Sequence, residues 1–149
     1  MNNLGIEYCV GKSCKKDISQ HLYECDDFFV PLLSSRVNLD EFAEKIFSSC
    51  TTFEAWHCND LVGLVSCYFN NERFVFINHV SVCKSFQRKG IINTLLKDCI
   101  RQSKKRDFYF LRLEVHDHNK IAKKIYKNYG FQLVSRKKDL LLFELNMGI

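Results

Sequence analysis

The sequence has little of what marks membrane, secreted or loop-rich proteins. It contains one proline and six glycines in 149 residues, which excludes a collagen-like or loop-dominated chain. No apolar run approaches the roughly 18–20 residues that a membrane helix needs. The first residues lack the basic and apolar regions of a signal peptide. We therefore expect a soluble, cytoplasmic protein without a membrane partner.

Cysteine is abundant, but it does not follow a metal-binding or redox pattern. None of the eight cysteines forms a Cys-x-x-Cys pair, which argues against a zinc ribbon or a thioredoxin-type site. Most lie in apolar stretches, where a free cysteine packs as a small hydrophobic residue. We expect reduced thiols that fill the core, as is usual in a cytoplasm.

Length and composition indicate one folded domain spanning residues 1–149. Hydrophobic residues make up 46% of the chain and aromatic residues 13%, enough for a core at this length. The net charge of +5 comes mostly from the second half. Such a charge permits a phosphate-bearing cofactor or weak nucleic-acid contact, and it is also compatible with an ordinary solvated surface.

Hydrophobic periodicity predicts interleaved strands and helices in the order β-α-βββ-α-β-α-ββ. Residues 17–37 look irregular. We expect strands at 6–10, 52–58, 61–69, 73–82, 108–116, 131–136 and 140–145, and helices that begin at Asn38, after Gly90 and at Asn119. The buried helix faces are predicted to comprise Phe42, Ala43, Ile46, Phe47 and Cys50, then Ile92, Leu95, Leu96 and Cys99, then Ile121, Ala122, Ile125, Tyr126 and Tyr129. This order indicates a mixed α/β sheet with helices on its faces.

A basic loop precedes the helix after the third strand of the central meander. It reads Gln87-Arg88-Lys89-Gly90-Ile91-Ile92. A helix N-terminus has unpaired N–H groups and a partial positive charge, and a glycine there lets the backbone approach an anion. A pyrophosphate would fit, although an ordinary basic loop before a helix would look the same.

Two motifs resemble those of the GNAT (GCN5-related N-acetyltransferase) superfamily. The first comprises Val80-Ser81-Val82, Gln87-Arg88-Lys89-Gly90-Ile91-Ile92 and Leu95-Leu96, and it is similar to the family's acyl-CoA-binding motif, Gln/Arg-x-x-Gly-x-Gly/Ala. The second comprises Leu113-Glu114-Val115, Asn119, Ala122, Ile125-Tyr126 and Gly130-Phe131. The resemblance covers roughly residues 60–145 and implies an α/β (α+β) GNAT fold. That fold has a mixed, mostly antiparallel sheet of about six to seven strands with helices on both faces.

The resemblance also implies transfer of an acetyl group from acetyl-CoA to an amine. Val80 and Val82 would contact the pantetheine arm through their backbone, with the Val80 amide as an oxyanion donor. Gln87, Arg88, Lys89, Gly90, Ile91 and Ile92 would wrap the pyrophosphate, and Asn119 would contact the arm of CoA. Ile92 stands where the family usually has Gly or Ala, so its branched side chain could crowd the cofactor.

Two side chains are candidates for acid and base. Tyr126 occupies the family's usual general-acid position, but it could also be a helix aromatic packed in the core. Glu114 lies twelve residues before it in a Leu-Glu-Val context that resembles ribosomal-protein N-terminal acetyltransferases, in which such a Glu is the base. An ion pair between Glu114 and Arg112 is the alternative.

The neighbouring strand and the first helical region offer acceptor contacts. Asn78 stands where some members have a carboxylate or His, and it could orient an acceptor. His79 has the opposite parity and is a weaker candidate unless a bulge turns it. In this fold the acceptor is chosen by the region around residues 21–37, which includes Phe28 and Phe29. Asp26 and Asp27 could attract a cationic amine or could be solvated charges.

His116-Asp117-His118 is a weak metal pattern because no third ligand is evident, so we expect no metal. The prediction is therefore an acetyl-CoA-dependent N-acetyltransferase that acts on a small amine, an amino sugar or a protein N-terminus. We expect no nucleic-acid partner, and exposed edge strands are compatible with a homodimer. Two alternatives are a catalytically silent CoA-binding module, which Ile92 and the missing carboxylate at Asn78 favour, and a small basic RNA-binding protein.

Overall fold

A computed structural model describes residues 5–29 and 31–148 of the chain and contains seven strands and four α-helices in that part. The strands are β1 Ile6–Val10, β2 Thr51–His57, β3 Asp60–Tyr68, β4 Phe74–Val82, β5 Phe110–His116, β6 Gln132–Lys137 and β7 Leu140–Asn146. The helices are α1 Lys15–Glu24, α2 Leu39–Ser49, α3 Ile91–Lys105 and α4 Lys120–Asn128. Short 3₁₀ turns lie at Asp26–Phe28 (η1), Leu33–Ser35 (η2) and Lys84–Phe86 (η3).

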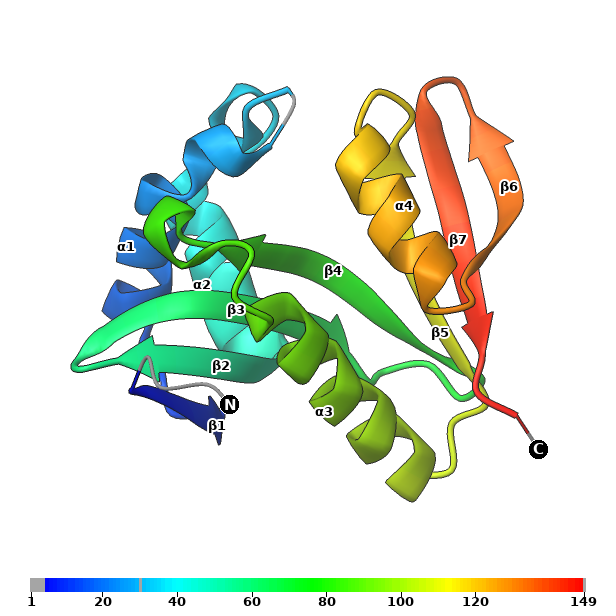
Figure 1. The fold of residues 1–149 in the computed structure, drawn as a ribbon, viewed down its shortest axis with the longest axis horizontal. Coiled ribbons are helices and arrows are strands. Elements are labelled where there is room, and N and C mark those ends of the chain that lie inside the picture. The colour runs from blue at the N-terminus through cyan, green and yellow to red at the C-terminus, as the bar shows by residue number, and fades with distance from the viewer. Residues whose placement is uncertain (1–4, 30, 149) are drawn as a thin grey trace.

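The strands form one sheet in the order β1-β2-β3-β4-β5-β7-β6. Every neighbouring pair is antiparallel except β4 and β5, which are parallel. Helices α1 and α2 cover one face, while α3 and α4 lie on the other (Figure 1). The predicted fold class, a mixed and mostly antiparallel sheet with helices on both faces, is confirmed.

Helix α1 was missed in the sequence, where residues 17–37 look irregular. Only Ile18, His21 and Leu22 are buried on it, so its apolar stripe is short. Its N-cap is Cys14, whose backbone N–H donates to the Asp17 carboxylate at 2.9 Å. Because cysteine is not among the usual N-cap residues, the start of this helix has no ordinary sequence signal.

The other predicted helices begin where expected, with two errors in their buried faces. The Asn38 side chain accepts from the Glu41 N–H at 3.0 Å and caps α2. Phe47 and Ile121, however, are 50% and 74% exposed, so their placement in the core was wrong. Since α2 and α4 each present a narrow stripe to the sheet, residues at the margin of the predicted face remain in solvent.

Cysteine fills the core only in part. All eight cysteines are free, and Cys25, Cys67, Cys83 and Cys99 are buried as predicted. Cys14 and Cys58 are exposed, which corrects the expectation for those two. No helix in residues 5–29 and 31–148 is long and apolar enough to cross a membrane.

Helix α3 begins directly above Gly63 of β3. A β-carbon placed on Gly63 would lie 2.8 Å from Cγ2 of Ile91 and 3.2 Å from the β-carbon of Ala55. Glycine therefore lets the first turn of α3 approach the sheet closely. This contact sets the distance between the sheet and the N-terminus of α3, which lies next to the end of β4.

A fully buried carboxylate anchors the segment that leads into α1. Glu54 on β2 is 0% exposed, and its side chain accepts from the backbone N–H groups of Lys12 and Ser13 at 3.0–3.1 Å. It also accepts from the hydroxyls of Ser13 and Thr52, each at 2.6 Å, and from the Trp56 indole N–H at 3.0 Å. These donors satisfy the buried oxygens and hold the start of α1 against the sheet.

Replacing Glu54 with Gln should destabilise the protein. An amide nitrogen would face N–H and O–H donors where an oxygen now accepts from them, so we expect a loss of roughly 2–4 kcal/mol in the free energy of unfolding. Urea denaturation measures this loss. Glu7→Gln is the control, because that carboxylate is exposed and pairs only with Lys12, at 3.3 Å. Equal stability of the two variants would contradict the anchoring role.

Candidate active site

Strands β4 and β5 separate part-way along their length. Residues Phe74–Ile77 of β4 pair with Phe110–Leu113 of β5, and the later residues of the two described strands are not paired with each other. On the other side of β4, Cys67 pairs with Ile77 and Ser66 with His79, so Asn78 forms a bulge. A bulge bends its strand and shifts the side-chain alternation by one residue. The last residues of β4 thus lose their partner strand on one side and open toward α4 (Figure 1).

A cavity of about 650 Å³ lies between the end of β4, the start of α3 and helix α4. Nine of the predicted site residues line it: Val80, Val82, Gln87, Arg88, Gly90, Ile91, Ile92, Asn119 and Tyr126. Lys89, Glu114, Asn78 and Phe29 are not among its lining residues. The side chain of Phe28 lies outside the described part of the structure. One cavity therefore unites most residues of the two sequence motifs.

The loop before α3 presents backbone donors to this cavity. Arg88 and Gly90 both have positive φ, 63° and 84°, and the first helical bond is donated by Thr94 N–H to the Gly90 carbonyl. The N–H groups between them have no acceptor within the helix ladder. Gln87 donates its side-chain N–H to the Val82 carbonyl at 3.1 Å and closes the loop. Successive N–H groups around left-handed residues form a concave anion site.

Helix α4 forms the opposite wall. The Asn119 side-chain oxygen accepts from the Ala122 N–H at 3.0 Å, which leaves its NH₂ group to donate to a ligand. Tyr126 is 7% exposed and packs edge-on against Phe131, with ring centroids 5.6 Å apart. Burial raises the pKa of the Tyr126 hydroxyl above its usual value. The phenol therefore keeps its proton at neutral pH and can donate it.

Asp27, which the sequence offered as a contact for a cationic amine, also lines the cavity. The other lining residues were not predicted as site residues from the sequence, and they are Lys84, Phe86, Asn93, Ile121, Ala122, Ile125, Asn128 and Tyr129. The Tyr129 hydroxyl donates to the Asn93 side chain and so joins α4 to the first turn of α3. Tyr129 lies three residues after Tyr126 on the same helix face, which was the signal available in the sequence.

The predicted base lies on the opposite face of β5. Glu114 is exposed and alternates with Leu113 and Val115, which are buried beside Tyr126. Its suspected ion pair with Arg112 is absent among the described residues. Arg112 instead donates to Glu144 at 2.7 Å. The carboxylate of Glu114 is therefore available to a group that approaches from that face.

Asn78 and Phe29 lie toward the face covered by α1 and α2. The Asn78 side-chain oxygen accepts from the Ser66 hydroxyl at 2.7 Å and from the Cys50 thiol at 3.5 Å. Its amide nitrogen is buried without a partner among the described residues. A buried donor without an acceptor is costly, so this NH₂ group is suited to a ligand's oxygen.

The bulge at Asn78 changes the side-chain alternation of β4 and so turns His79. The sequence made His79 a candidate only if such a bulge were present. Its ring packs against Phe29 and Phe42, with centroids 5.2 and 5.6 Å away, and its Nε2 contacts the Ser81 hydroxyl at 2.7 Å. Burial, with the nearby His21 and Arg36, lowers the pKa of His79 to about 3. The ring is therefore neutral at physiological pH.

Other candidate polar residues have structural partners. The Asp26 carboxylate accepts from the Ser34 N–H and hydroxyl, which lowers its pKa, whereas Asp27 lines the cavity. Asp117 accepts from Lys123 and Arg136, and these bonds lower its pKa to about 2. Asp117, the central residue of the His116-Asp117-His118 pattern, is therefore engaged in salt bridges with Lys123 and Arg136.

A model of the acetyltransferase (GNAT) family matches residues 16–131. The chain belongs to this family. No curated protein sequence matches the chain.

Solved structures agree with the GNAT fold. A GNAT-family acetyltransferase from Staphylococcus aureus Mu50 is 16% identical, with a TM-score of 0.78 over 96% of this chain and 99% of that one. The ribosomal-protein-S18-alanine N-acetyltransferase from Escherichia coli is 15% identical, with a TM-score of 0.77 over 96% of both chains. PaiA N-acetyltransferase from Thermoplasma acidophilum, in complex with coenzyme A, is 14% identical, with a TM-score of 0.74 over 94% and 99%.

The buried His79 of this GNAT protein should make its stability depend on pH. The unfolded chain binds a proton on this ring near pH 6.5, whereas the folded protein resists it down to about pH 3. The contribution is therefore constant above pH 6.5 and is lost as the pH falls toward 3, by about 1.4 kcal/mol per pH unit.

Replacing His79 with Gln should make this loss shallower while keeping an Nε2 donor to Ser81. Urea denaturation between pH 7 and pH 4 measures the slope for the wild type and the variant. His118→Gln is the matched control, because the side chain of His118 is 64% exposed. A wild-type slope in His79→Gln would contradict the assignment.

Proposed function

We propose that this GNAT protein transfers an acetyl group from acetyl-CoA to a primary amine. The observation that carries the proposal is the single cavity in which the unpaired end of β4, the start of α3 and Tyr126 meet. A strand edge without a partner and a helix N-terminus are both sets of backbone donors that a ligand can satisfy.

Acetyl-CoA fits this arrangement along its length. The pantetheine arm would run beside β4 and bond to the backbone of Val80 and Val82, with the Val80 N–H directed at the thioester oxygen. The pyrophosphate would lie at residues 87–92, whose N–H groups surround the start of α3. Lys89 would take part through its backbone N–H, although the residue is not among those that line the cavity. The coenzyme A bound to the Thermoplasma acidophilum neighbour supports this choice of cofactor.

Acid and base would act from opposite faces of the sheet. Tyr126 stays protonated in the cavity and would donate to the departing thiolate of CoA. Glu114 is exposed on the other face and would accept the proton of the attacking amine, directly or through water. A protein N-terminus, a small amine or an amino sugar would each supply this amine, and the name of the Escherichia coli neighbour favours the first.

We expect action in the cytoplasm, no metal, no nucleic-acid partner, and association as a homodimer. The edge strand β6 carries the half-exposed Leu133 and Val134, which would suit contact with a second copy. One observation favours a silent CoA-binding module instead: Ile92, which stands where the family usually has Gly or Ala, is among the residues that line the cavity.

Binding of acetyl-CoA should raise the melting temperature. A ligand at 100 times its Kd stabilises the native state by about 2.7 kcal/mol, or roughly 5–10 °C for a chain of this size. Arg88→Asn should reduce the shift by removing a cation while tolerating the left-handed backbone. Arg101→Ala, at an exposed position further along α3, is the control. No shift at millimolar acetyl-CoA would overturn the proposal.

Tyr126→Phe and Glu114→Gln should each lower kcat by about 10²–10⁴-fold and leave the KM for acetyl-CoA nearly unchanged, because each removes one proton-transfer group. Release of free CoA with a panel of amines measures turnover. Tyr109→Phe and Glu72→Gln change exposed residues outside the cavity and serve as matched controls. Wild-type turnover in Tyr126→Phe would reject the acid, and wild-type turnover in Glu114→Gln would reject the base. Cofactor binding without turnover on any amine would favour the silent module.

A further inference from the structure

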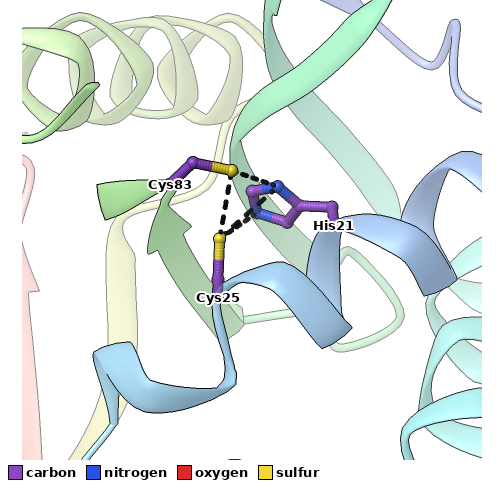
Figure 2. Close-up of side chains that lie close together, drawn as sticks. All are labelled: His21, Cys25 and Cys83. Carbon is purple, nitrogen blue, oxygen red and sulfur yellow. Dashed lines mark hydrogen bonds between the residues drawn. The ribbon is translucent and has the colours of Figure 1, made fainter. Parts of the chain in front are cut away.

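Three buried side chains gather where α1 ends and β4 ends. His21 lies in the last turn of α1, Cys25 directly follows that helix, and Cys83 directly follows β4. The two sulfur atoms lie 3.3 Å apart, and Nδ1 of His21 is 3.7 Å from the Cys25 sulfur and 3.6 Å from the Cys83 sulfur (Figure 2). None of these residues takes part in the proposed acetyl transfer.

The histidine is already fully hydrogen-bonded, which disfavours a metal ion at this cluster. Nδ1 lies 2.9 Å from the Leu61 carbonyl, which only accepts, so Nδ1 carries the proton. Nε2 then accepts from the Ser81 hydroxyl at 2.7 Å. The Cys25 sulfur is 3.7 Å from both nitrogens, and therefore lies along neither lone-pair direction. A zinc ion needs a nitrogen lone pair that this ring does not present.

The two sulfur atoms have different acidities. The Cys25 S–H donates to Cys83 and, together with His21, lowers the pKa of the Cys83 thiol to about 5, against the effect of burial. The same contact, with burial, raises the pKa of Cys25. Cys83 is thus the thiolate, and a thiolate is the reactive form of cysteine.

Cys83 is the more accessible of the two cysteines. It is 7% exposed, compared with 1% for Cys25. A molecule as small as a peroxide would therefore meet Cys83 first, and Cys25 would act as the second thiol. Cys83 itself is not among the residues that line the cavity, although its chain neighbours Val82 and Lys84 are.

We propose that Cys25 and Cys83 form a reversible disulfide when the protein meets a hydroperoxide. The Cys83 thiolate attacks one peroxide oxygen. An S–O bond forms, the O–O bond breaks, and hydroxide or alkoxide leaves. Cys83 is then a sulfenic acid. The Cys25 sulfur attacks the Cys83 sulfur, the S–S bond forms, and the S–O oxygen leaves as water with the proton of Cys25. An added dithiol reverses the reaction by exchange.

The disulfide would also act on the cofactor site, and this consequence rests on the proposed function. Closing the sulfur–sulfur distance to about 2.05 Å draws Cys83 toward α1. Since Val82 and Lys84 line the cavity on either side of it, the wall that would hold acetyl-CoA moves with Cys83. We therefore expect weaker binding of acetyl-CoA by the oxidised protein.

The core contains a matched control pair. Cys67 and Cys99 also lie with their sulfur atoms 3.3 Å apart, but both are fully buried. Burial, followed by the contact with Cys99, raises the pKa of Cys67. Proximity is thus equal in the two pairs, while thiolate character and access differ. If proximity alone decided oxidation, both pairs would react alike.

Mass mapping of peptides from the wild-type protein tests the site directly. After brief treatment with hydrogen peroxide at pH 7, we expect a Cys25–Cys83 cross-link that forms at least about 100-fold faster than a Cys67–Cys99 cross-link. An added dithiol should remove it. Cys25→Ser should instead leave Cys83 as a sulfenic acid that a dimedone probe traps. Similar rates for both pairs, or stoichiometric zinc in the purified protein by elemental analysis, would overturn the proposal.

Melting with acetyl-CoA before and after oxidation tests the consequence separately. We expect the oxidised wild type to show a shift reduced by at least half, and the treated Cys25→Ser/Cys83→Ser variant to keep the shift of its untreated form. An unchanged shift in the cross-linked wild type would reject the effect on binding. No shift in the reduced protein would refute the acetyl-CoA proposal, whereas the mapped cross-link would still establish the disulfide.

Discussion

The parting of β4 from β5 is the constraint on which the rest of the site depends. Parallel pairing ends at Ile77 and Leu113, and the bulge at Asn78 bends β4 away beyond that point. The N–H and C=O groups along the open edge must find other partners, because buried backbone groups left unpaired are costly. The start of α3 adds further N–H groups at the same place. In the described part of the chain, the fold thus creates a row of backbone donors that a ligand would complete.

Buried polar contacts on the other face of the sheet keep this opening in place. Glu54 holds the start of α1 through N–H and O–H donors, and a chain of hydrogen bonds from His79 through Ser81 to His21 links the end of β4 to the same helix. Such networks are stabilising only when every member is satisfied, so they permit one position of α1 rather than several. On the cavity side, the close contact at Gly63 sets the distance between α3 and the sheet.

Local patterns in the sequence predicted most of the fold and half of the residues that line the cavity. Asn38 and Asn119 are ordinary N-caps, and Gly90 marks the start of α3, so these elements were placed correctly. Helix α1 was missed because its cap is a cysteine and its apolar stripe is short. The cluster of His21, Cys25 and Cys83 was also missed. Its cysteines are 58 residues apart in the chain, and no spacing rule predicts a contact that only tertiary packing creates.

The geometry of the parted strands places the two residues proposed as acid and base on opposite faces of β5. Tyr126 and Glu114 are carried by adjacent elements, yet β5 separates them, because Glu114 alternates with the residues that pack beside the tyrosine. A thioester lying in the opening would present its sulfur to the cavity and its carbonyl carbon to the far side. In the proposed mechanism, the leaving thiolate would meet a buried phenol that has kept its proton, while the incoming amine would meet the exposed carboxylate of Glu114. Burial thus suits Tyr126 to the role of acid, and exposure makes Glu114 accessible to an amine.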